Sequence, residues 1–361
     1  MFSRQFLSSS SQQGLTQVAL DLEIAIRDSL FDSWKLLHNS VFLTQDYRRR
    51  QALRLHHLST RTDGPIRLYF ESFWNKFNPE TSYLFHLASH AASDLSSSLE
   101  VVVDPLLADV SIHSCFGKSP QSPFNHTTRV LYLGENVRPD YSIYDYSLTT
   151  DIYTYLGRNS YLPVWQVYFF DSFKSSSSYR FDNVIEDLIQ TCRKSSKPWK
   201  SRQIDVTYVG NNNQPNRVAA IKVLQKLDLK IELYGSSTRP VESKHHLYGN
   251  SKFVLCPENS FYPGYVTEKI LEPIFCGSIA IYDGSLSDEL RTILSPLMVN
   301  LNDVLNDSFD PSFPYIENLA SANQTLFEDF MRESALNYER NAINLFKTIF
   351  QPYIRHLPYS F

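Results

Sequence analysis

The sequence predicts an α/β protein with two domains of similar size, each built on a mostly parallel sheet. The chain has 361 residues, which exceeds one ordinary domain. Short apolar runs alternate with helix-length segments in both halves, the pattern of a parallel sheet. A Ser- and Lys-rich stretch at residues 172–202 separates the two alternations. Two such domains leave room for a crevice between them, in which a substrate could bind.

Composition limits the classes of partner. Apolar residues make up 42% of the chain and charged residues 20%, values typical of a folded protein. The formal net charge is −4, without the basic excess of a nucleic-acid-binding chain. We therefore expect no nucleic acid partner.

The cysteines and the N-terminal sequence give information about the cellular compartment of the protein. The four cysteines lie far apart and include no C-x-x-C pair, so neither a zinc site nor a dense disulfide framework is expected. The N-terminal sequence MFSRQFLSSSSQQG lacks the apolar stretch of a signal peptide, and no segment approaches the apolar length of a membrane span. These features predict a soluble cytoplasmic protein.

Residues 1–62 are expected to form a helical N-terminal extension. Apolar residues recur at helical spacing between residues 17 and 57. The end of this segment is basic, with Arg48, Arg49, Arg50 and Arg54 close together. This cluster could make a peripheral contact with a membrane or an acidic partner, although a solvated helix face is the favoured interpretation.

The remaining domains follow from the positions of the apolar runs. Residues 63–180 should form the first domain, with strands at 66–70, 101–103, 108–112 and 128–133. A linker at 181–203 should hold one short helix near residues 184–192. The second domain, 204–330, should contain strands at 205–209, 230–233, 253–256 and 278–282 and a helix at 217–227. Residues 331–361 should form a helical tail.

One strand-to-helix connection is suited to binding an anion. Residues 252–269, KFVLCPENSFYPGYVTEK, read as a buried strand, a polar turn and a helix start with Thr267 as N-cap. The N–H groups of the helix start and the charge of Lys269 could hold an anion, while Glu268 could accept from hydroxyls. Spacing alone favours an ordinary connection with solvated charges.

A longer match changes that interpretation. The strings F-V-L-C-P-E-N-S, Y-V-T-E-K and G-S-I-A-I-Y-D-G resemble the donor-binding signature of glycosyltransferase family 10, the α-1,3/1,4-fucosyltransferases. The resemblance implies a GT-B fold, in which two Rossmann-like domains face a cleft. It also implies a GDP-fucose site containing Asn259, Tyr265, Glu268 and Lys269, with Lys269 facing the diphosphate. The upstream string V-G-N-N-N-Q-P-N-R resembles the family segment whose arginine also contacts the diphosphate, here Arg217.

The first domain carries a second match. The string V-L-Y-L-G-E-N-V-R-P-D-Y resembles the acceptor-domain segment of the family, which implies that Glu135 is the general base. Inverting transfer needs a carboxylate that removes the acceptor hydroxyl proton as its oxygen attacks the anomeric carbon. Arg217 and Lys269 could then stabilise the GDP leaving group. Neither catalytic half contains D-x-D, the motif with which metal-dependent glycosyltransferases commonly hold a divalent ion, so we expect no metal ligands and no obligatory cofactor.

The sequence departs from the family at Pro257, Ala280 and Pro273, and Pro273 should kink or shorten its helix. The resemblance implies an acceptor oligosaccharide, with GlcNAc or Glc of an N-acetyllactosamine-type unit and an α-1,3 linkage as the expectation. Without a membrane anchor, the chain is most similar to the soluble bacterial members. Two alternatives stay open: a GT-B transferase that uses another GDP-sugar, and a noncatalytic binding protein with this fold. The sequence does not predict the oligomeric state.

Overall fold

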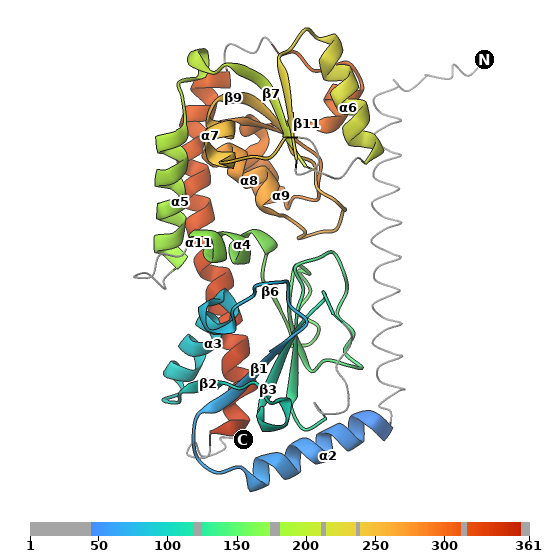
Figure 1. The fold of residues 1–361 in the computed structure, drawn as a ribbon, viewed down its shortest axis with the longest axis vertical. Coiled ribbons are helices and arrows are strands. Elements are labelled where there is room, and N and C mark those ends of the chain that lie inside the picture. Colours follow the sequence, from blue (N-terminus) through green and yellow to red (C-terminus); the bar gives the residue numbers. More distant parts are fainter. Residues whose placement is uncertain are drawn as a thin grey trace, which may run out of the picture.

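A computed structural model describes residues 45–117, 125–173, 181–210, 214–235, 239–311 and 316–354. Two parallel sheets lie one above the other in the molecule (Figure 1). We call the region of β1–β6 the first half and the region of β7–β11 the second half. The helix expected before residue 45 lies outside the described residues.

The first half is built on a six-stranded sheet in the order β2-β1-β3-β4-β5-β6. Every strand pairs in parallel with its neighbours. All residues of the central strands β3 and β4 are buried, as expected for a sheet covered on both faces. The strands are β1 (Ile66–Glu71), β2 (Leu99–Val101), β3 (Val110–Ser114), β4 (Thr128–Tyr132), β5 (Tyr146–Thr149) and β6 (Asn159–Tyr161).

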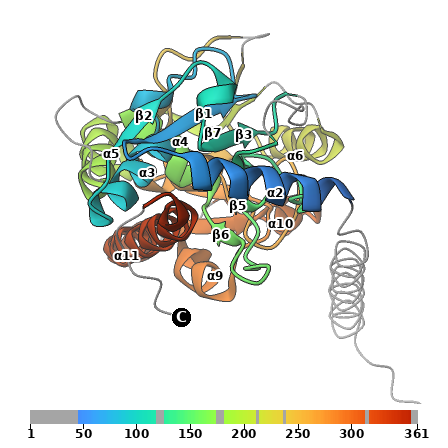
Figure 2. The same ribbon diagram turned by 90° about the horizontal axis from the view of Figure 1, so that it is seen from below.

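The helices of the first half are α2 (Gln45–Thr60), α3 (Tyr83–Asp94) and α4 (Val164–Phe173), with the short 3-10 helices η1 (Pro79–Thr81) and η2 (Pro105–Leu107). Helix α2 crosses the lower end of the molecule (Figure 2). Helix α3 begins at the N-cap Ser82, whose hydroxyl accepts from the backbone N–H of Phe85.

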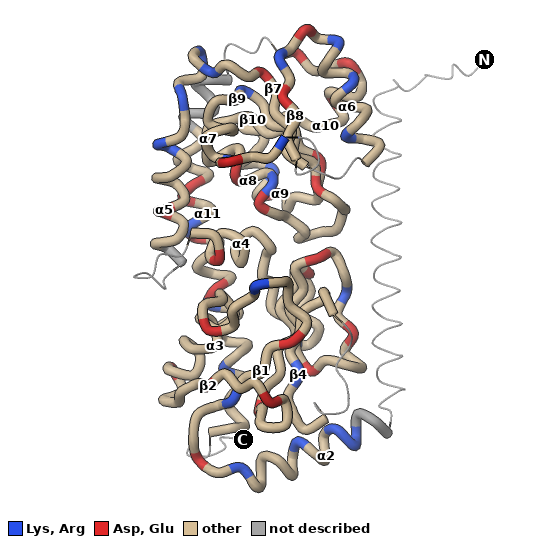
Figure 3. Tube along the Cα trace, viewed as in Figure 1, with Lys and Arg blue, Asp and Glu red and all other residues tan. Residues whose placement is uncertain are grey.

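Basic residues lie along α2 (Figure 3), and the contacts of two of them attach this helix to the first half. Arg50 is 4% exposed and donates to the carbonyl oxygens of Ser142 and Ile143. Arg50 and Arg54 also form ion pairs with Asp145, at 3.7 and 3.6 Å. For these two arginines the favoured interpretation, a solvated helix face, is therefore wrong, because both are held by the first half. Arg48 and Arg49 are exposed, and a peripheral membrane contact stays a prediction.

The second half is built on a five-stranded parallel sheet in the order β11-β10-β9-β7-β8. The strands are β7 (Ile204–Val209), β8 (Ile231–Tyr234), β9 (Ser251–Leu255), β10 (Ile279–Tyr282) and β11 (Met298–Asn300). The helices are α6 (Pro215–Lys226), α7 (Lys244–Gly249), α8 (Glu268–Phe275), α9 (Asp288–Leu294) and α10 (Leu301–Leu305), with the 3-10 helices η4 (Trp199–Ser201) and η5 (Ser295–Leu297). All eight strands predicted from the sequence are present, with ends displaced by at most two residues.

Two helices connect the halves, and one of them runs along both sheets (Figure 1). Helix α5 (Phe181–Ser195) replaces the short helix expected in the linker and buries one apolar face. Helix α11 (Ile316–Phe350), followed by η6 (Gln351–Tyr353), extends along both halves and packs on α3, α5, α8 and α9 (Figure 1). Since α11 contacts both halves, the division into domains at 62/63, 180/181, 203/204 and 330/331 stays a prediction. Within the described residues, no helix combines the length and the apolar character needed to cross a membrane.

Candidate active site

The turn between β9 and α8 carries most of the predicted donor residues. Strand β9 ends at Leu255 and α8 begins at Glu268. Thr267 is the N-cap of α8, and its hydroxyl accepts from the backbone N–H of Lys269 at 3.4 Å. The predicted cap is therefore confirmed. Pro273 lies inside α8, which ends two residues later at Phe275.

A cavity of about 260 Å³ lies at the carboxyl ends of β7 and β9, where ligands bind in open parallel sheets. Four predicted donor residues line it: Arg217, Asn259, Glu268 and Lys269. The rest of its lining is Tyr208, Val209, Gly210, Lys244, Tyr248, Leu255, Cys256, Pro257 and Glu272. Arg217 and Lys269, which come from different matched strings, thus line the same cavity.

Arg217 is held rigidly at the cavity. It is the third residue of α6 and only 4% exposed. Its Nη2 donates to the carbonyl oxygen of Pro257 and to Oδ1 of Asn259, both at 2.8 Å. The planar guanidinium is thereby fixed on the β9–α8 turn, an arrangement suited to binding phosphate oxygens.

Lys269 is the second cation of the cavity. Its Nζ lies 3.3 Å from Oε2 of Glu258 and 3.0 Å from the hydroxyl of Thr267. Glu258 was not among the residues predicted for the site, although it stands inside the matched string. Its side chain is fully buried, and burial raises the pKa of its carboxyl while Lys269 and Thr267 oppose that rise. Nothing in the sequence distinguishes a buried carboxylate in a polar turn from an exposed one.

A third cationic side chain, which was not predicted from the sequence, lines the same cavity. Lys244 donates to Oε2 of Glu272 at 3.1 Å and to the hydroxyl of Tyr168 at 3.3 Å. Burial, the largest single influence, works against its charged form, but Glu272, Tyr168 and Glu268 together outweigh burial and raise the pKa of Lys244. Lys244 lies in the short helix α7, outside all of the matched strings, so only the fold brings it here.

Two of the predicted site residues, Glu135 and Tyr265, do not line this cavity. Tyr265 is 2% exposed, and its pKa is raised first by burial and next by the negative charge of Glu135. Glu135 is exposed in the loop that follows β4 of the first half. The charge of Glu135, in the first half, therefore raises the pKa of Tyr265, in the second half. Tyr265 belongs to the turn between β9 and α8, which we call the donor turn.

The donor turn packs directly against the first half. Gly264 has a φ of +91°, and a Cβ at this position would lie 2.5 Å from the carbonyl oxygen of Thr150. The hydroxyl of Tyr161 donates to the carbonyl oxygen of Gly264 at 2.9 Å. This close approach joins the two halves beside the predicted residues.

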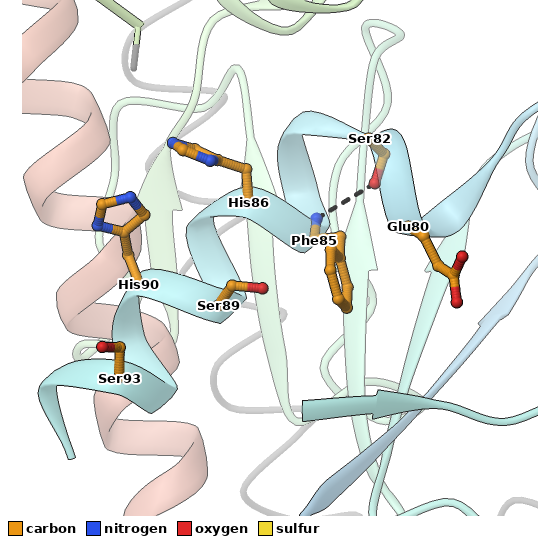
Figure 4. Close-up of a pocket in the computed structure, with 7 residues that line it drawn as sticks. All are labelled: Glu80, Ser82, Phe85, His86, Ser89, His90 and Ser93. Carbon is orange, nitrogen blue, oxygen red and sulfur yellow. Dashed lines mark hydrogen bonds between the residues drawn. The ribbon is translucent and has the colours of Figure 1, made fainter. Parts of the chain in front are cut away.

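A separate cavity of about 430 Å³ lies against α3, lined by Glu80, Ser82, Phe85, His86, Ser89, His90 and Ser93 (Figure 4). None of the predicted site residues contributes to it. Across the described ranges, no group of three or more His, Cys, Asp and Glu side chains is arranged to hold a metal ion. The expectation of a reaction without an obligatory metal stays a prediction.

Comparison with known proteins agrees with this architecture. The two parallel sheets of Rossmann type place this chain in the class of GT-B proteins. A model of the "Alpha-(1,3)-fucosyltransferase FucT N-terminal domain" matches residues 68–168. A model of "Glycosyltransferase family 10 (fucosyltransferase) C-term" matches residues 199–297. The chain belongs to glycosyltransferase family 10.

Two curated proteins are similar in sequence. The α-(1,3)-fucosyltransferase FucT of Helicobacter pylori is 26% identical over 237 residues, 59% of this chain and 48% of that protein. The putative fucosyltransferase R654 of Acanthamoeba polyphaga mimivirus is 36% identical over 92 residues, 24% of this chain and 14% of that protein. The chain thus matches about half the length of the first relative and a smaller part of the second.

Solved structures support the fold. A crystal structure of an α1,3-fucosyltransferase superposes with a TM-score of 0.53 at 18% identity, over 80% of this chain and 93% of that one. A structure of an α1,3-fucosyltransferase with GDP-fucose gives 0.51, also at 18% identity, over 79% and 92%. The predicted fold class, a GT-B fold with two Rossmann-like domains, is confirmed.

Proposed function

We propose that this protein is an inverting fucosyltransferase that transfers L-fucose from GDP-fucose to a hydroxyl of an acceptor glycan. The observation that carries the proposal is the convergence of Arg217 and Lys269 on one cavity at the carboxyl ends of β7 and β9, in a chain of this family. GDP and GDP-fucose are present in solved structures of the α1,3-fucosyltransferase that this fold resembles, which supports the choice of donor.

The cavity suits the leaving group. As the bond between the sugar and GDP breaks, negative charge grows on the diphosphate. Arg217, Lys269 and the N–H groups at the start of α8 supply positive charge where this would occur. Because Arg217 and Lys269 are already hydrogen-bonded in place, little reorganisation would accompany the reaction. Asn259, Glu268 and Tyr265 complete the proposed donor site.

Glu135 is the proposed general base. It belongs to the first half, whereas the donor residues belong to the second half, so an acceptor between the two would present its hydroxyl to the carboxylate on the side away from GDP. The exposed position of Glu135 and its electrostatic effect on Tyr265 support this role. No metal ion takes part in the proposed reaction.

The acceptor that we propose is an oligosaccharide with GlcNAc or Glc in an N-acetyllactosamine-type unit, joined through an α-1,3 linkage. The name of the Helicobacter pylori relative supports this linkage. The acceptor residues themselves belong to loops of the first half, where specificity varies most readily.

Donor choice tests the proposal. Transfer to N-acetyllactosamine would be measured as GDP release in separate reactions, with GDP-fucose, GDP-mannose or GDP-glucose as the single donor. We expect turnover with GDP-fucose and none with the other two sugars. Preference for GDP-mannose would indicate a GT-B transferase with another donor, while GDP-fucose binding without transfer to any acceptor in a broad panel would indicate a noncatalytic binding protein.

A further inference from the structure

Glu258 joins the separate parts of the proposed donor site. It stands in the β9–α8 turn, and its side chain is 0% exposed although it carries a carboxylate. Burying an ionised carboxylate is costly unless several donors compensate for the lost water. The hydrogen bonds of the Glu258 carboxylate therefore indicate which neighbouring groups its burial serves to position.

The carboxylate receives hydrogen bonds from three residues. Thr267 donates from its backbone N–H at 2.9 Å and from its hydroxyl at 2.8 Å, Lys269 donates from Nζ at 3.3 Å, and the hydroxyl of Tyr282 donates at 3.3 Å. Because the hydroxyl hydrogen of Thr267 points to Glu258, the lone pairs of that oxygen face Lys269. Both the N-cap of α8 and the ammonium of Lys269 are thus oriented by Glu258.

The ammonium of Lys269 has three N–H donors. Glu258 and Thr267 accept two of them, and Oε1 of Glu268, which lines the same cavity, lies 3.8 Å from the nitrogen. The ammonium is thus held at the wall of the cavity by acceptors on the β9–α8 turn and the first turn of α8. The backbone carbonyl of Glu258 also accepts from Nη2 of Arg217 at 3.3 Å. One residue therefore contacts both cations of the proposed donor site, Lys269 through its side chain and Arg217 through its backbone.

We propose that Glu258 is a positioning residue that fixes the Lys269 ammonium, and with it the N-terminus of α8, at the point where the donor diphosphate binds. This inference rests on the proposed function, since it names how one of its groups is held. Glu258 does not touch the substrate and acts only through Thr267 and Lys269.

Replacing Glu258 by Gln tests position separately from charge. The amide is nearly isosteric, but in either orientation it sets an NH2 group against Lys269 or Thr267, which are donors themselves. Loss of a negative charge beside the diphosphate would by itself tighten GDP binding. Weaker GDP binding in Glu258→Gln would therefore report a displaced ammonium rather than an altered charge.

The experiment is a double-mutant cycle of Glu258→Gln and Lys269→Ala, with the GDP dissociation constant and kcat as readouts. In the wild-type background we expect Glu258→Gln to weaken GDP binding about tenfold, the scale of one charge-assisted hydrogen bond. We expect kcat to fall by up to about a hundredfold, as for a misplaced catalytic group. In the Lys269→Ala background the same change should weaken GDP binding clearly less than in the wild type, since only its contacts with Thr267 remain to be lost.

Glu328→Gln is the matched control. Glu328 is 2% exposed and pairs with Arg193 at 2.7 Å, but it lies on α11 and lines none of the cavities described above. We expect this variant to lose stability while keeping the GDP affinity and kcat of the wild type.

The outcomes distinguish the positioning role of Glu258 from the proposed fucosyltransferase function. Unchanged or tighter GDP binding in Glu258→Gln, or an equal loss in the Lys269→Ala background, overturns the positioning role. A wild type that binds GDP but transfers no fucose contradicts the proposed function, while the binding cycle still decides on Glu258. A wild type that binds no GDP overturns both.

Discussion

The guanidinium of Arg138, from the first half, lies over the ring of Tyr262, from the second half, with its central carbon 3.3 Å from the ring centroid. Arg138 also forms an ion pair with the fully buried Asp151 at 3.2 Å, and the hydroxyl of Tyr262 donates to Asp151 at 3.4 Å. Arg138 is in the same loop as Glu135, and Tyr262 is in the donor turn. This contact therefore ties the proposed base to the proposed donor site.

Tyr262→Ala should lower kcat several-fold, since loss of the ring leaves the Glu135 loop less firmly placed against the donor turn. An exposed cation–π contact contributes about 0.5–1 kcal/mol, and a desolvated one about 2 kcal/mol or more. Steady-state kinetics with saturating GDP-fucose measures the effect. Tyr262→Phe keeps the stacking ring and should stay near the wild type. An equal loss in both variants would show that the ring contact does not place the loop.

Gly264→Ala should destabilise the protein by about 2–3 kcal/mol or more, because its Cβ would meet the Thr150 carbonyl oxygen in addition to the strain of a positive φ. Urea unfolding measures this free energy. Gly157 is a matched control, since its φ is +79° but a Cβ there would meet nothing within 4 Å. Gly157→Ala should cost only about 1 kcal/mol. Equal losses would mean that the halves do not approach closely at Gly264.

Arg217→Lys should weaken GDP binding by about tenfold or more, although the charge is kept. The guanidinium reaches Pro257 and Asn259 together and still presents further donors, which a single ammonium cannot do. Calorimetric titration with GDP gives the affinity. Arg193→Lys, at an ion pair on α5 outside the cavity, should bind GDP as the wild type does. Wild-type affinity in Arg217→Lys would remove Arg217 from the donor site.

His113 should make the protein less stable in mild acid. Burial, aided by the charge of Arg129, lowers the pKa of His113 from its ordinary 6.5 to about 3. The unfolded chain therefore binds a proton below about pH 6.5 that the folded protein does not bind. The stabilising contribution is present above pH 6.5 and is lost as the pH falls from 6.5 towards 3, by at most about 1.4 kcal/mol per pH unit.

Unfolding free energies at pH 7.5 and 5.5 would test this dependence. His113→Gln removes the titrating group, so its stability should fall less between the two pH values than that of the wild type. An identical fall in both proteins would show that His113 does not keep a depressed pKa.

The sequence predicted the fold well where hydrophobic pattern decides it. The strands β1, β4, β7 and β9 are apolar runs with clear turns after them, and they appear close to their predicted bounds. Strands β5 and β6, with the sequences YSLT and NSY, are short and polar, so no hydrophobic run revealed them. The linker helix α5 is longer than expected because it packs against α4 and α11, a tertiary effect that local pattern does not contain.

The candidate site was only partly predictable. Two specific family strings located Arg217 and Lys269, and the structure places both residues at one cavity. Glu258 lies in a neighbouring family string, F-V-L-C-P-E-N-S, but its role depends on burial. Arg138 and Tyr262 are far apart in sequence and come together only when the two halves meet. Such long-range contacts follow from the fold rather than from any local motif.

The central claim, fucosyl transfer with Glu135 as the base, is tested most directly by product formation in EDTA with GDP-fucose and N-acetyllactosamine. The comparison is between wild type, Glu135→Gln and Asp140→Asn, the last removing an exposed carboxylate from the same loop. We predict that wild type and Asp140→Asn transfer fucose under chelation, while Glu135→Gln binds GDP normally and transfers about a hundredfold or more slowly. Near-wild-type transfer by Glu135→Gln would contradict the assignment of the base, and loss of wild-type transfer in EDTA would contradict the metal-free mechanism.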